Sequence, residues 1–315
     1  MGTEDDRSGL KVVTKDLQVP SPPTSAPPPW QAGEGRMIFL FDVLWSLGAL
    51  LVWGPPLVLA AWIPLELWAL HPLAAVAALP LSYLVFLVSL SLWMGAFSAL
   101  LPQETPGTSR VFVDRAFFVF LVRWGLEKYA PRPFITHIQL LTGLRTLHYR
   151  LLGMELSWSS HISPGAILYG PSLIRLGHLT YIGDFAHLSS HLSQGDKLVL
   201  APVVIGDRTN IGAHCKIGPG CTIGSDVRIG ALCDLAPGVE IGDGVELSPA
   251  VQMGMSVKVG AHCKIEPRSF LPSWTTVPAG EIWGGDPACK IGDVQVTRGE
   301  LRRRERRKGR ATADS

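Results

Sequence analysis

The feature that most constrains the fold of this chain is a six-residue repeat that begins at Ile205. A large aliphatic residue leads thirteen successive repeats without a slip: Ile205, Ile211, Ile217, Ile223, Ile229, Leu235, Ile241, Leu247, Met253, Val259, Ile265, Leu271 and Val277. Three six-residue sides make one coil of a triangular solenoid, and each leading side chain then stacks inside it on its counterpart one coil away. Because no single repeat could bury its own apolar residue, the pattern predicts a parallel β-helix.

The other positions of the repeat support this fold and account for the cysteines. The fifth position is small or β-branched, and four of the five cysteines occupy it: Cys215, Cys221, Cys233 and Cys263. An odd number of cysteines without a CxxC pair argues against a disulfide framework or a zinc ribbon. We therefore predict reduced cysteines that act as small buried apolar residues.

Weaker repeats precede the regular run. Ile162, Leu168 and Ile174 follow one phase, and Ile182 and Leu188 follow another, which gives eighteen repeats or six coils in total. The frame breaks seriously at residues 191–202, HLSQGDKLVLAP, where we predict a loop that projects from a corner of the solenoid.

The repeats resemble those of the hexapeptide-repeat acyltransferases, which form left-handed parallel β-helices. The interrupting loop and the following PVVIGD (Pro202–Asp207) are similar to the corresponding part of the sugar acetyltransferases. The segment WGGDPACKI (Trp283–Ile291) resembles the closing segment of that family. For residues 155–292 the resemblance implies a left-handed β-helix acyltransferase domain that forms homotrimers. Its co-substrate would be acetyl-CoA or another acyl-CoA, with active sites between subunits.

Acyl transfer from a thioester needs a base near neutral pH, and histidine suits that role. The resemblance places this base where the loop leaves the coils, at His191, with His187 as the alternative. His214 and His262 share the context GAHCK but lie 48 residues apart, which is eight repeats and not a whole number of coils. They therefore belong to different faces, and we predict that both are corner residues.

The resemblance also suggests where CoA would lie. Lys290 matches a basic position of the closing segment, and Arg268 and Lys264 are further candidates for its phosphates. A solvated surface charge is an equally good interpretation of each. We predict no metal site.

Residues 36–102 are predicted to form a two-helix transmembrane hairpin. Its apolar runs, Met37–Ile63 and Leu73–Leu101, each exceed the roughly 20 residues that a helix needs to cross a bilayer. No Lys or Arg occurs between Arg36 and Arg110. The positive-inside rule therefore places both termini and the β-helix in the cytoplasm.

Residues 110–153 mix aromatic, basic and apolar residues at helical spacing, which is typical of interfacial amphipathic helices broken at Pro131 and Pro133. Packing against the base of the β-helix is an equally good alternative. The paired membrane helices and HYRLLGMEL (His148–Leu156) also resemble the C-terminal membrane domain of polylysine-synthetase-type peptide synthetases.

Both ends of the chain are predicted to be disordered. Residues 1–35 are rich in proline. Within residues 293–315, the stretch from Arg298 to Arg310 holds eight Lys or Arg against two acidic residues. Such a tail favours anionic membrane lipid. Nothing else in the chain supports nucleic-acid binding.

The sequence thus predicts a membrane-anchored O- or N-acetyltransferase that uses acyl-CoA and acts on a hydroxyl or amine. The acceptor could be a small molecule, glycan, lipid or peptide. A non-catalytic trimeric membrane scaffold is the main alternative, since a fold does not by itself confer activity. A zinc enzyme like the γ-class carbonic anhydrases is a weaker one. It needs three histidine ligands, and the close pair His187 and His191 precedes His214, the reverse of that family's order.

Overall fold

The computed structural model describes residues 31–129 and 134–294 of this 315-residue chain. The basic tail and most of the proline-rich segment lie outside the described residues, as do Pro131 and Pro133. Residues up to Gly48 form a unit separate from Ala49–Ser315, and every contact given below lies within the second unit.

The N-terminal part of the chain is helical. It comprises α1 (Gln31–Leu70), α2 (Pro72–Ala77) and α3 (Leu79–Leu100). Within them, Asp42–Leu70 and Leu79–Leu100 are long and apolar enough to cross a membrane. Helix α1 begins inside the segment predicted to be a tail, and it continues beyond the apolar run Met37–Ile63, past Pro64, to Leu70. A proline in a helix removes one hydrogen bond, and this long apolar helix continues in spite of it.

Strand β1 (Gly107–Arg110) and three further helices, α4 (Arg115–Tyr129), α5 (Ile135–Leu140) and α6 (Thr142–Leu151), connect this part to the β-helix. Helix α6 packs so closely on α3 that a Cβ atom on Gly95 would lie 2.7 Å from Cβ of Leu151. On the other side, the side-chain amide of Gln139 in α5 donates to the carbonyl of Ala166, 3.1 Å away. Of the two arrangements left open by the sequence, the structure shows packing against the base of the β-helix.

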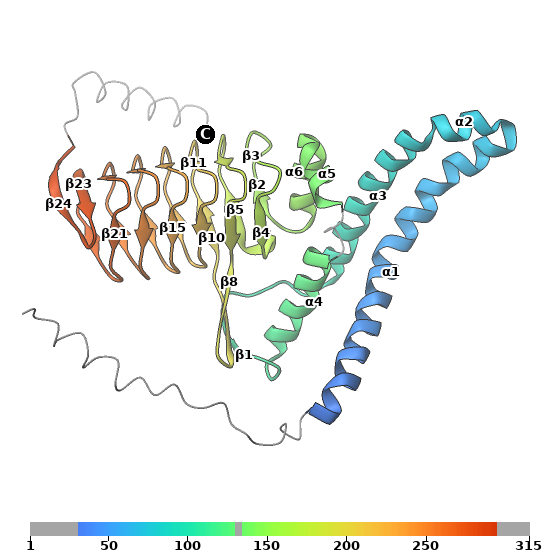
Figure 1. Cartoon of the computed structure of the whole chain (residues 1–315), viewed down its shortest axis with the longest axis horizontal. Helices are drawn as coiled ribbons and strands as arrows, with labels where there is room; N and C mark the ends of the chain where they lie inside the picture. The colour runs from blue at the N-terminus through green and yellow to red at the C-terminus, as the bar shows by residue number, and fades with distance from the viewer. Residues whose placement is uncertain (1–30, 130–133, 295–315) are drawn as a thin grey trace, which may run out of the picture. The chain divides into compact units, whose positions relative to one another are not determined.

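The β-helix has three faces, each a parallel sheet (Figure 1). The first face comprises β2 (Glu155–Leu156), β5 (Ile174–Leu176), β10 (Val203–Ile205), β13 (Thr222–Ile223), β16 (Glu240–Ile241), β19 (Lys258–Val259) and β22 (Thr276–Val277). The second comprises β3 (His161–Ile162), β6 (Tyr181–Ile182), β11 (Asn210–Ile211), β14 (Arg228–Ile229), β17 (Glu246–Leu247), β20 (Lys264–Ile265) and β23 (Glu281–Gly285), followed by the antiparallel β24 (Ala288–Asp293). The third comprises β4 (Ile167–Tyr169), β7 (His187–Ser189), β12 (Lys216–Ile217), β15 (Asp234–Leu235), β18 (Gln252–Met253) and β21 (Phe270–Leu271).

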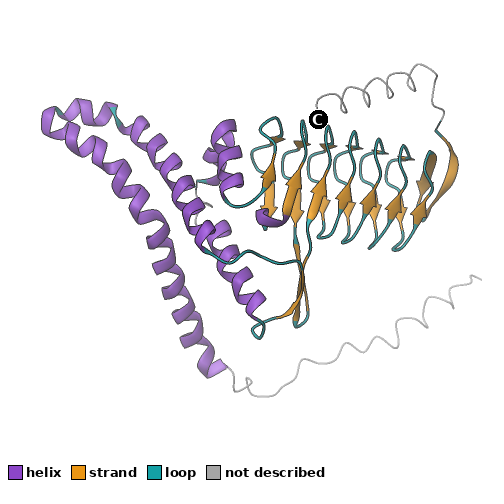
Figure 2. Cartoon of the chain, turned by 180° about the vertical axis from the view of Figure 1, so that it is seen from behind, coloured by secondary structure: helices purple, strands orange, loops and turns teal. Residues whose placement is uncertain are grey.

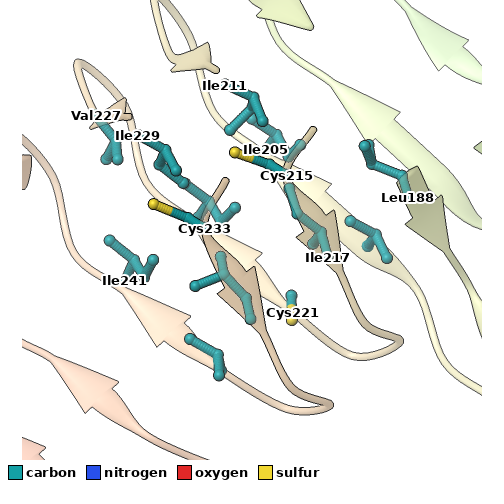
Figure 3. Packing of buried hydrophobic residues seen from close by; sticks show 14 of the residues in the cluster. Leu188, Ile205, Ile211, Cys215, Ile217, Cys221, Val227, Ile229, Cys233 and Ile241 are labelled. Atoms are coloured by element: carbon teal, nitrogen blue, oxygen red, sulfur yellow. The ribbon is translucent and has the colours of Figure 1, made fainter. Parts of the chain in front are cut away.

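The register confirms the predicted parallel β-helix. Ile205 pairs with Ile223 and Ile223 with Ile241, so leading residues stack at intervals of one coil, 18 residues. All thirteen leading residues are at most 4% exposed. Figure 3 shows some of these side chains, including Ile205, Ile211 and Ile217, with those of Cys215, Cys221 and Cys233 inside the coil. The predicted burial of the four fifth-position cysteines is confirmed, and Cys289 is exposed.

The coil count differs slightly from the prediction. The first face holds seven strands, which makes about seven turns instead of six. The prediction missed the repeat led by Leu156 and the one led by Trp283, which pairs with Ile265. It also placed Ile174 in the leading position, whereas Leu176 aligns with Leu156 and Ile205. The 3-10 helix η1 (Pro171–Leu173) adds residues before this strand and so changes the phase of the repeat.

The loop predicted to project at residues 191–202 is a β-hairpin. Strands β8 (His191–Gln194) and β9 (Lys197–Leu200) pair with each other, and β9 also pairs with β1 (Figure 2). Leu198 and Leu200 alternate with more exposed residues and pack in a cluster with Phe117 and Phe120 of α4. This apolar alternation stabilises the hairpin against the helix.

The corners of the solenoid use left-handed backbone. From Arg208 to Gly280, every sixth residue has a positive φ. His214 and His262 belong to this set, with φ of 57° and 61°, so the prediction that they are corner residues is confirmed. Their shared sequence context reflects the geometry of the repeat.

Candidate functional site

The outer surface of the third face, in its first two coils, carries two of the predicted site residues. In β7, Leu188 points inward and is fully buried. Side chains alternate along a strand, so its neighbours His187 and Ser189 point outward. In the adjacent strand β4, Tyr169 pairs with Ser189. The rings of Tyr169 and His187 are 4.7 Å apart between centroids.

His191 lies where the hairpin leaves the coil. Its ring centroid is 4.9 Å from that of Phe120 and 5.8 Å from that of Tyr169. The Ser189 hydroxyl lies 3.5 Å from His191 Nδ1 and donates to the backbone carbonyl of His191, 2.9 Å away. The structure therefore brings both predicted histidines to one aromatic ring. The sequence did not indicate Tyr169, because an outward residue in a β-helix has no periodic signal, or Phe120, because its contact with His191 joins the helix α4 to a distant segment.

Helix α4 presents one side to this region. Phe120, Trp124 and Glu127 are spaced four and three residues apart, which places them on one face of the helix. Phe120 contacts His191, while Trp124 and Glu127 line a cavity. Between them, the buried Arg123 donates from Nε to the carbonyl of Pro102 at 2.7 Å and from a terminal nitrogen to that of Ser98 at 2.9 Å. These bonds satisfy carbonyls near the C-terminus of α3 and fix α4 there.

Two buried carboxyl groups lie near Arg123. Glu104 accepts a hydrogen bond from the Ser172 hydroxyl. Burial raises the pKa of Glu104, while the Ser172 bond and Arg123 oppose the increase. Burial raises the pKa of Glu127 well above its usual value, and repulsion from Glu104 adds to this effect. The buried cluster therefore favours protonated carboxyls over a second negative charge.

A cavity of about 310 Å³ lies between α4–α6 and the first coils. It is lined by Trp124, Glu127, Ile135, Thr136, Gln139, His148, Tyr149, Leu152, Gly165, Ala166, Ile167, Leu168, Tyr169 and Pro171. Because Tyr169 is also the ring between the two histidines, the cavity ends beside the candidate base.

Buried polar groups shape this cavity. Gln139 Nε2 donates to the Tyr149 hydroxyl at 3.0 Å, and Gln139 Oε1 accepts from the Gly165 amide at 3.0 Å. His148 is fully buried, and its Nδ1 lies 3.2 Å from the Ser91 hydroxyl of α3. Burial lowers the pKa of His148 to about 4 and raises the pKa of Tyr149 to about 12. These groups are therefore neutral around pH 7. His148 and Tyr149 begin the segment HYRLLGMEL noted above, but neither they nor Gln139 were predicted to line a cavity.

The candidate residues for CoA lie at the other end of the solenoid. Lys290 Nζ forms ion pairs with Glu281 at 2.9 Å and Asp293 at 2.7 Å, and these acids, Asp293 first, raise the pKa of Lys290 to about 12. Lys264 Nζ lies 2.9 Å from Glu266 Oε1. Arg268 is an exposed corner residue. The structure therefore does not bring these cations together with His191 and His187.

A zinc enzyme of the kind weighed above would need three histidine ligands close together. Across residues 31–129 and 134–294, no group of three or more His, Cys, Asp or Glu side chains is arranged to hold a metal ion. His214 is instead stacked on Phe185, with ring centroids 5.1 Å apart and an angle of 16° between the planes.

A model of the bacterial transferase hexapeptide, described as six repeats, matches residues 202–233 and 220–254. This chain carries the bacterial transferase hexapeptide repeat. The matched residues are the regular coils that follow the hairpin, and the match agrees with the parallel register of the strands. No curated protein matches the chain.

Several solved structures are similar in part. A hexapeptide transferase family protein from Anaplasma phagocytophilum is 19% identical, with a TM-score of 0.36, over 46% of this chain and 83% of its own. The acetyltransferase domain of PglB from Neisseria gonorrhoeae is 15% identical, with a TM-score of 0.36, over 49% and 66%. AntD, an N-acyltransferase from Bacillus cereus in complex with dTDP and 3-hydroxybutyryl-CoA, is 18% identical, with a TM-score of 0.37, over 51% and 94%. At these values the likeness concerns about half of this chain.

Proposed function

We propose that this chain is a membrane-anchored acyltransferase that moves an acyl group, most simply acetyl, from acyl-CoA to a hydroxyl or amine acceptor. The observation that carries the proposal is the pair His191 and His187 beside Tyr169, at the hairpin that interrupts a β-helix matching the transferase hexapeptide repeat. Histidine accepts a proton near neutral pH, which the attacking group must lose.

In the proposed reaction, the His191 imidazole removes the proton of the acceptor as its oxygen or nitrogen attacks the thioester carbonyl. The C–S bond then breaks, and the CoA sulfur takes up a proton as it leaves. The Ser189 hydroxyl, 3.5 Å from His191 Nδ1, is placed to orient the ring. Backbone amides at the corners are candidates to donate to the oxyanion. His187 is the alternative base.

The same proposal assigns roles to groups outside the site. The apolar helices hold the enzyme at the membrane. The arginines at their ends, Arg36 and Arg110, favour cytoplasmic termini and a cytoplasmic β-helix. Lys290, Arg268 and Lys264 are the proposed contacts of CoA phosphates. A homotrimer would let a neighbouring subunit bring these residues toward His191, which a single subunit does not do.

The test is acyl-CoA-dependent release of free thiol by the detergent-purified full chain, with and without candidate acceptors. We expect His191→Ala to lower turnover by roughly 10²–10⁴-fold, as for loss of a general base. His214→Asn is the matched control, because this histidine lies at a corner of the regular coils, between β11 and β12, and asparagine tolerates positive φ.

His187→Ala separates the two candidate bases in the same assay. A large loss with this variant and a small one with His191→Ala would move the role to His187. Full turnover with both variants would refute the assignment of the site.

A further inference from the structure

The cavity between α4–α6 and the first coils has the properties of a ligand site. Its volume of about 310 Å³ lies at the lower end of the range of about 300–1,000 Å³ that is typical of small-molecule pockets. Much of its lining is apolar, including Trp124, Ile135, Leu152, Ile167 and Pro171. Such a lining favours a ligand with an apolar body.

Two buried polar atoms among the cavity-lining residues have no hydrogen-bond partner in the part of the chain that the structure describes. One is Nε2 of His148, a residue with no exposed surface whose other ring nitrogen contacts Ser91. The second is Oε1 of Glu127. A buried polar atom without a partner costs about 1–3 kcal/mol. A hydroxyl group can both donate and accept, so a ligand hydroxyl would satisfy such atoms.

Electrostatics excludes charged ligands. The cavity lies among buried side chains, and burial disfavours a charge of either sign on any group within it. The buried guanidinium of Arg123 is already engaged by carbonyls at the end of α3. The cavity therefore does not suit the phosphates of CoA, and an uncharged polar group fits it best.

The position of the cavity links it to the candidate base. Tyr169 forms part of its wall, and the same ring contacts His187 and His191. On another side the wall is formed by α5, whose His137 ring contacts Tyr83 of α3 with centroids 5.6 Å apart. The cavity thus lies between the apolar helix α3, which contacts its lining residue His148, and the two candidate histidines, which contact its lining residue Tyr169.

We propose that this cavity binds an uncharged, hydroxyl-bearing amphiphile from the membrane, with its hydroxyl on His148 and Glu127. As a second step, which rests on the proposed function, this amphiphile is the acyl acceptor. Its hydroxyl then reaches His191 by moving past the ring of Tyr169.

The binding test uses the full chain in phosphatidylcholine vesicles and a ten-carbon alcohol that carries a photoreactive diazirine. We expect the label in the three segments that line the cavity, residues 124–127, 135–152 and 165–171. Ile167→Trp should fill the cavity and reduce this labelling about tenfold. Ile291→Trp is the matched control, since Ile291 is an exposed isoleucine, as is Ile167, on the opposite end of the solenoid. It should leave labelling unchanged.

His148→Leu tests the polar contact. Loss of one hydrogen bond should weaken labelling about fivefold. Diazirine probes of the same chain length that carry a carboxylate or a trimethylammonium group in place of the hydroxyl should label weakly in all variants. Stronger labelling by a short water-soluble diol than by the long alcohol would contradict the proposal that the ligand comes from the membrane. Label outside these three segments, or equal labelling of wild type and Ile167→Trp, would overturn the site.

The two proposals fail in different ways. If no acyl-CoA supports thiol release, the proposed function falls, and the labelling result still decides whether the cavity binds the alcohol. If thiol release proceeds and Ile167→Trp blocks labelling without raising the KM for a long-chain alcohol acceptor, the cavity is not the acceptor site.

Discussion

The first coils of the solenoid and the later ones use the same six-residue side, but they differ in regularity. From Ile205 to Val277 the repeat never slips, and its strands pair only with neighbouring coils. Before that, η1 shifts the phase, the hairpin β8–β9 leaves a corner, and α4–α6 cover the first coils. The candidate base and the buried cavity both belong to this irregular part. In this chain, departures from the repeat position the groups that could do chemistry.

The largest expected effect concerns the close packing of neighbouring coils in the regular part. A Cβ atom on Gly242 would lie 2.7 Å from the backbone nitrogen of Ala261 in the next coil. Because the backbone must shift, we expect Gly242→Ala to destabilise the fold by about 3 kcal/mol. Gly195 in the hairpin turn has a φ of 58° and open space around it, so Gly195→Ala should cost only about 1 kcal/mol. Chemical denaturation measures the free energy of unfolding of both variants. Equal destabilisation by the two substitutions would contradict the difference in packing between the two regions.

The second prediction concerns the irregular part and its response to acid. The folded protein holds His148 with a pKa of about 4 because of burial, whereas the unfolded chain has the ordinary value of 6.5. As the pH falls from 6.5 to 4, the unfolded state takes up the proton first, so stability is lost over this window. At 1.36 kcal/mol per pKa unit, the loss from this one group is roughly 3 kcal/mol.

His148→Asn should therefore flatten the pH dependence of the free energy of unfolding between pH 6.5 and 4. His214→Asn, at an exposed corner of the regular part, should leave it unchanged. If all three proteins lose stability in parallel, burial of His148 does not control acid sensitivity.

The smallest expected effect concerns the far end of the solenoid. Lys290 is an exposed residue paired with Glu281 and Asp293. Exposed ion pairs contribute little to stability, so Lys290→Gln should leave the Tm unchanged. If Lys290 contacts a CoA phosphate, the Kd for CoA should rise about threefold, because one charge-assisted bond is lost. Titration calorimetry measures this change, and an unaltered Kd would remove Lys290 from the proposed donor site.

The regular coils could be predicted from sequence because burial of one aliphatic residue every six positions leaves a direct signal. Leu156 was missed because it lies alone before the run, and Trp283 because an indole replaces the aliphatic side chain. The error at Ile174 has a local cause, since η1 adds residues that no periodicity shows. The pairing of β9 with β1 joins segments about 90 residues apart, and no local pattern encodes such a contact.

The site was predictable only in part for the same reason. His191 and His187 could be named because an interruption of a repeat is visible in sequence. Tyr169 and Glu127 acquire their roles from tertiary contacts with the histidines and with the cavity. The buried state of His148 follows from packing between α3 and the first coils, which the sequence of α6 does not specify by itself.

The final hairpin, β23–β24, limits how one β-helix can associate with another. A stack of parallel coils could continue indefinitely, since its last strand offers unpaired amides and carbonyls to another copy. Strand β24 folds back antiparallel on β23 and occupies that edge of the second face. A chain shortened to Gly285 would expose this edge and invite end-to-end association of β-helices, which the short hairpin opposes.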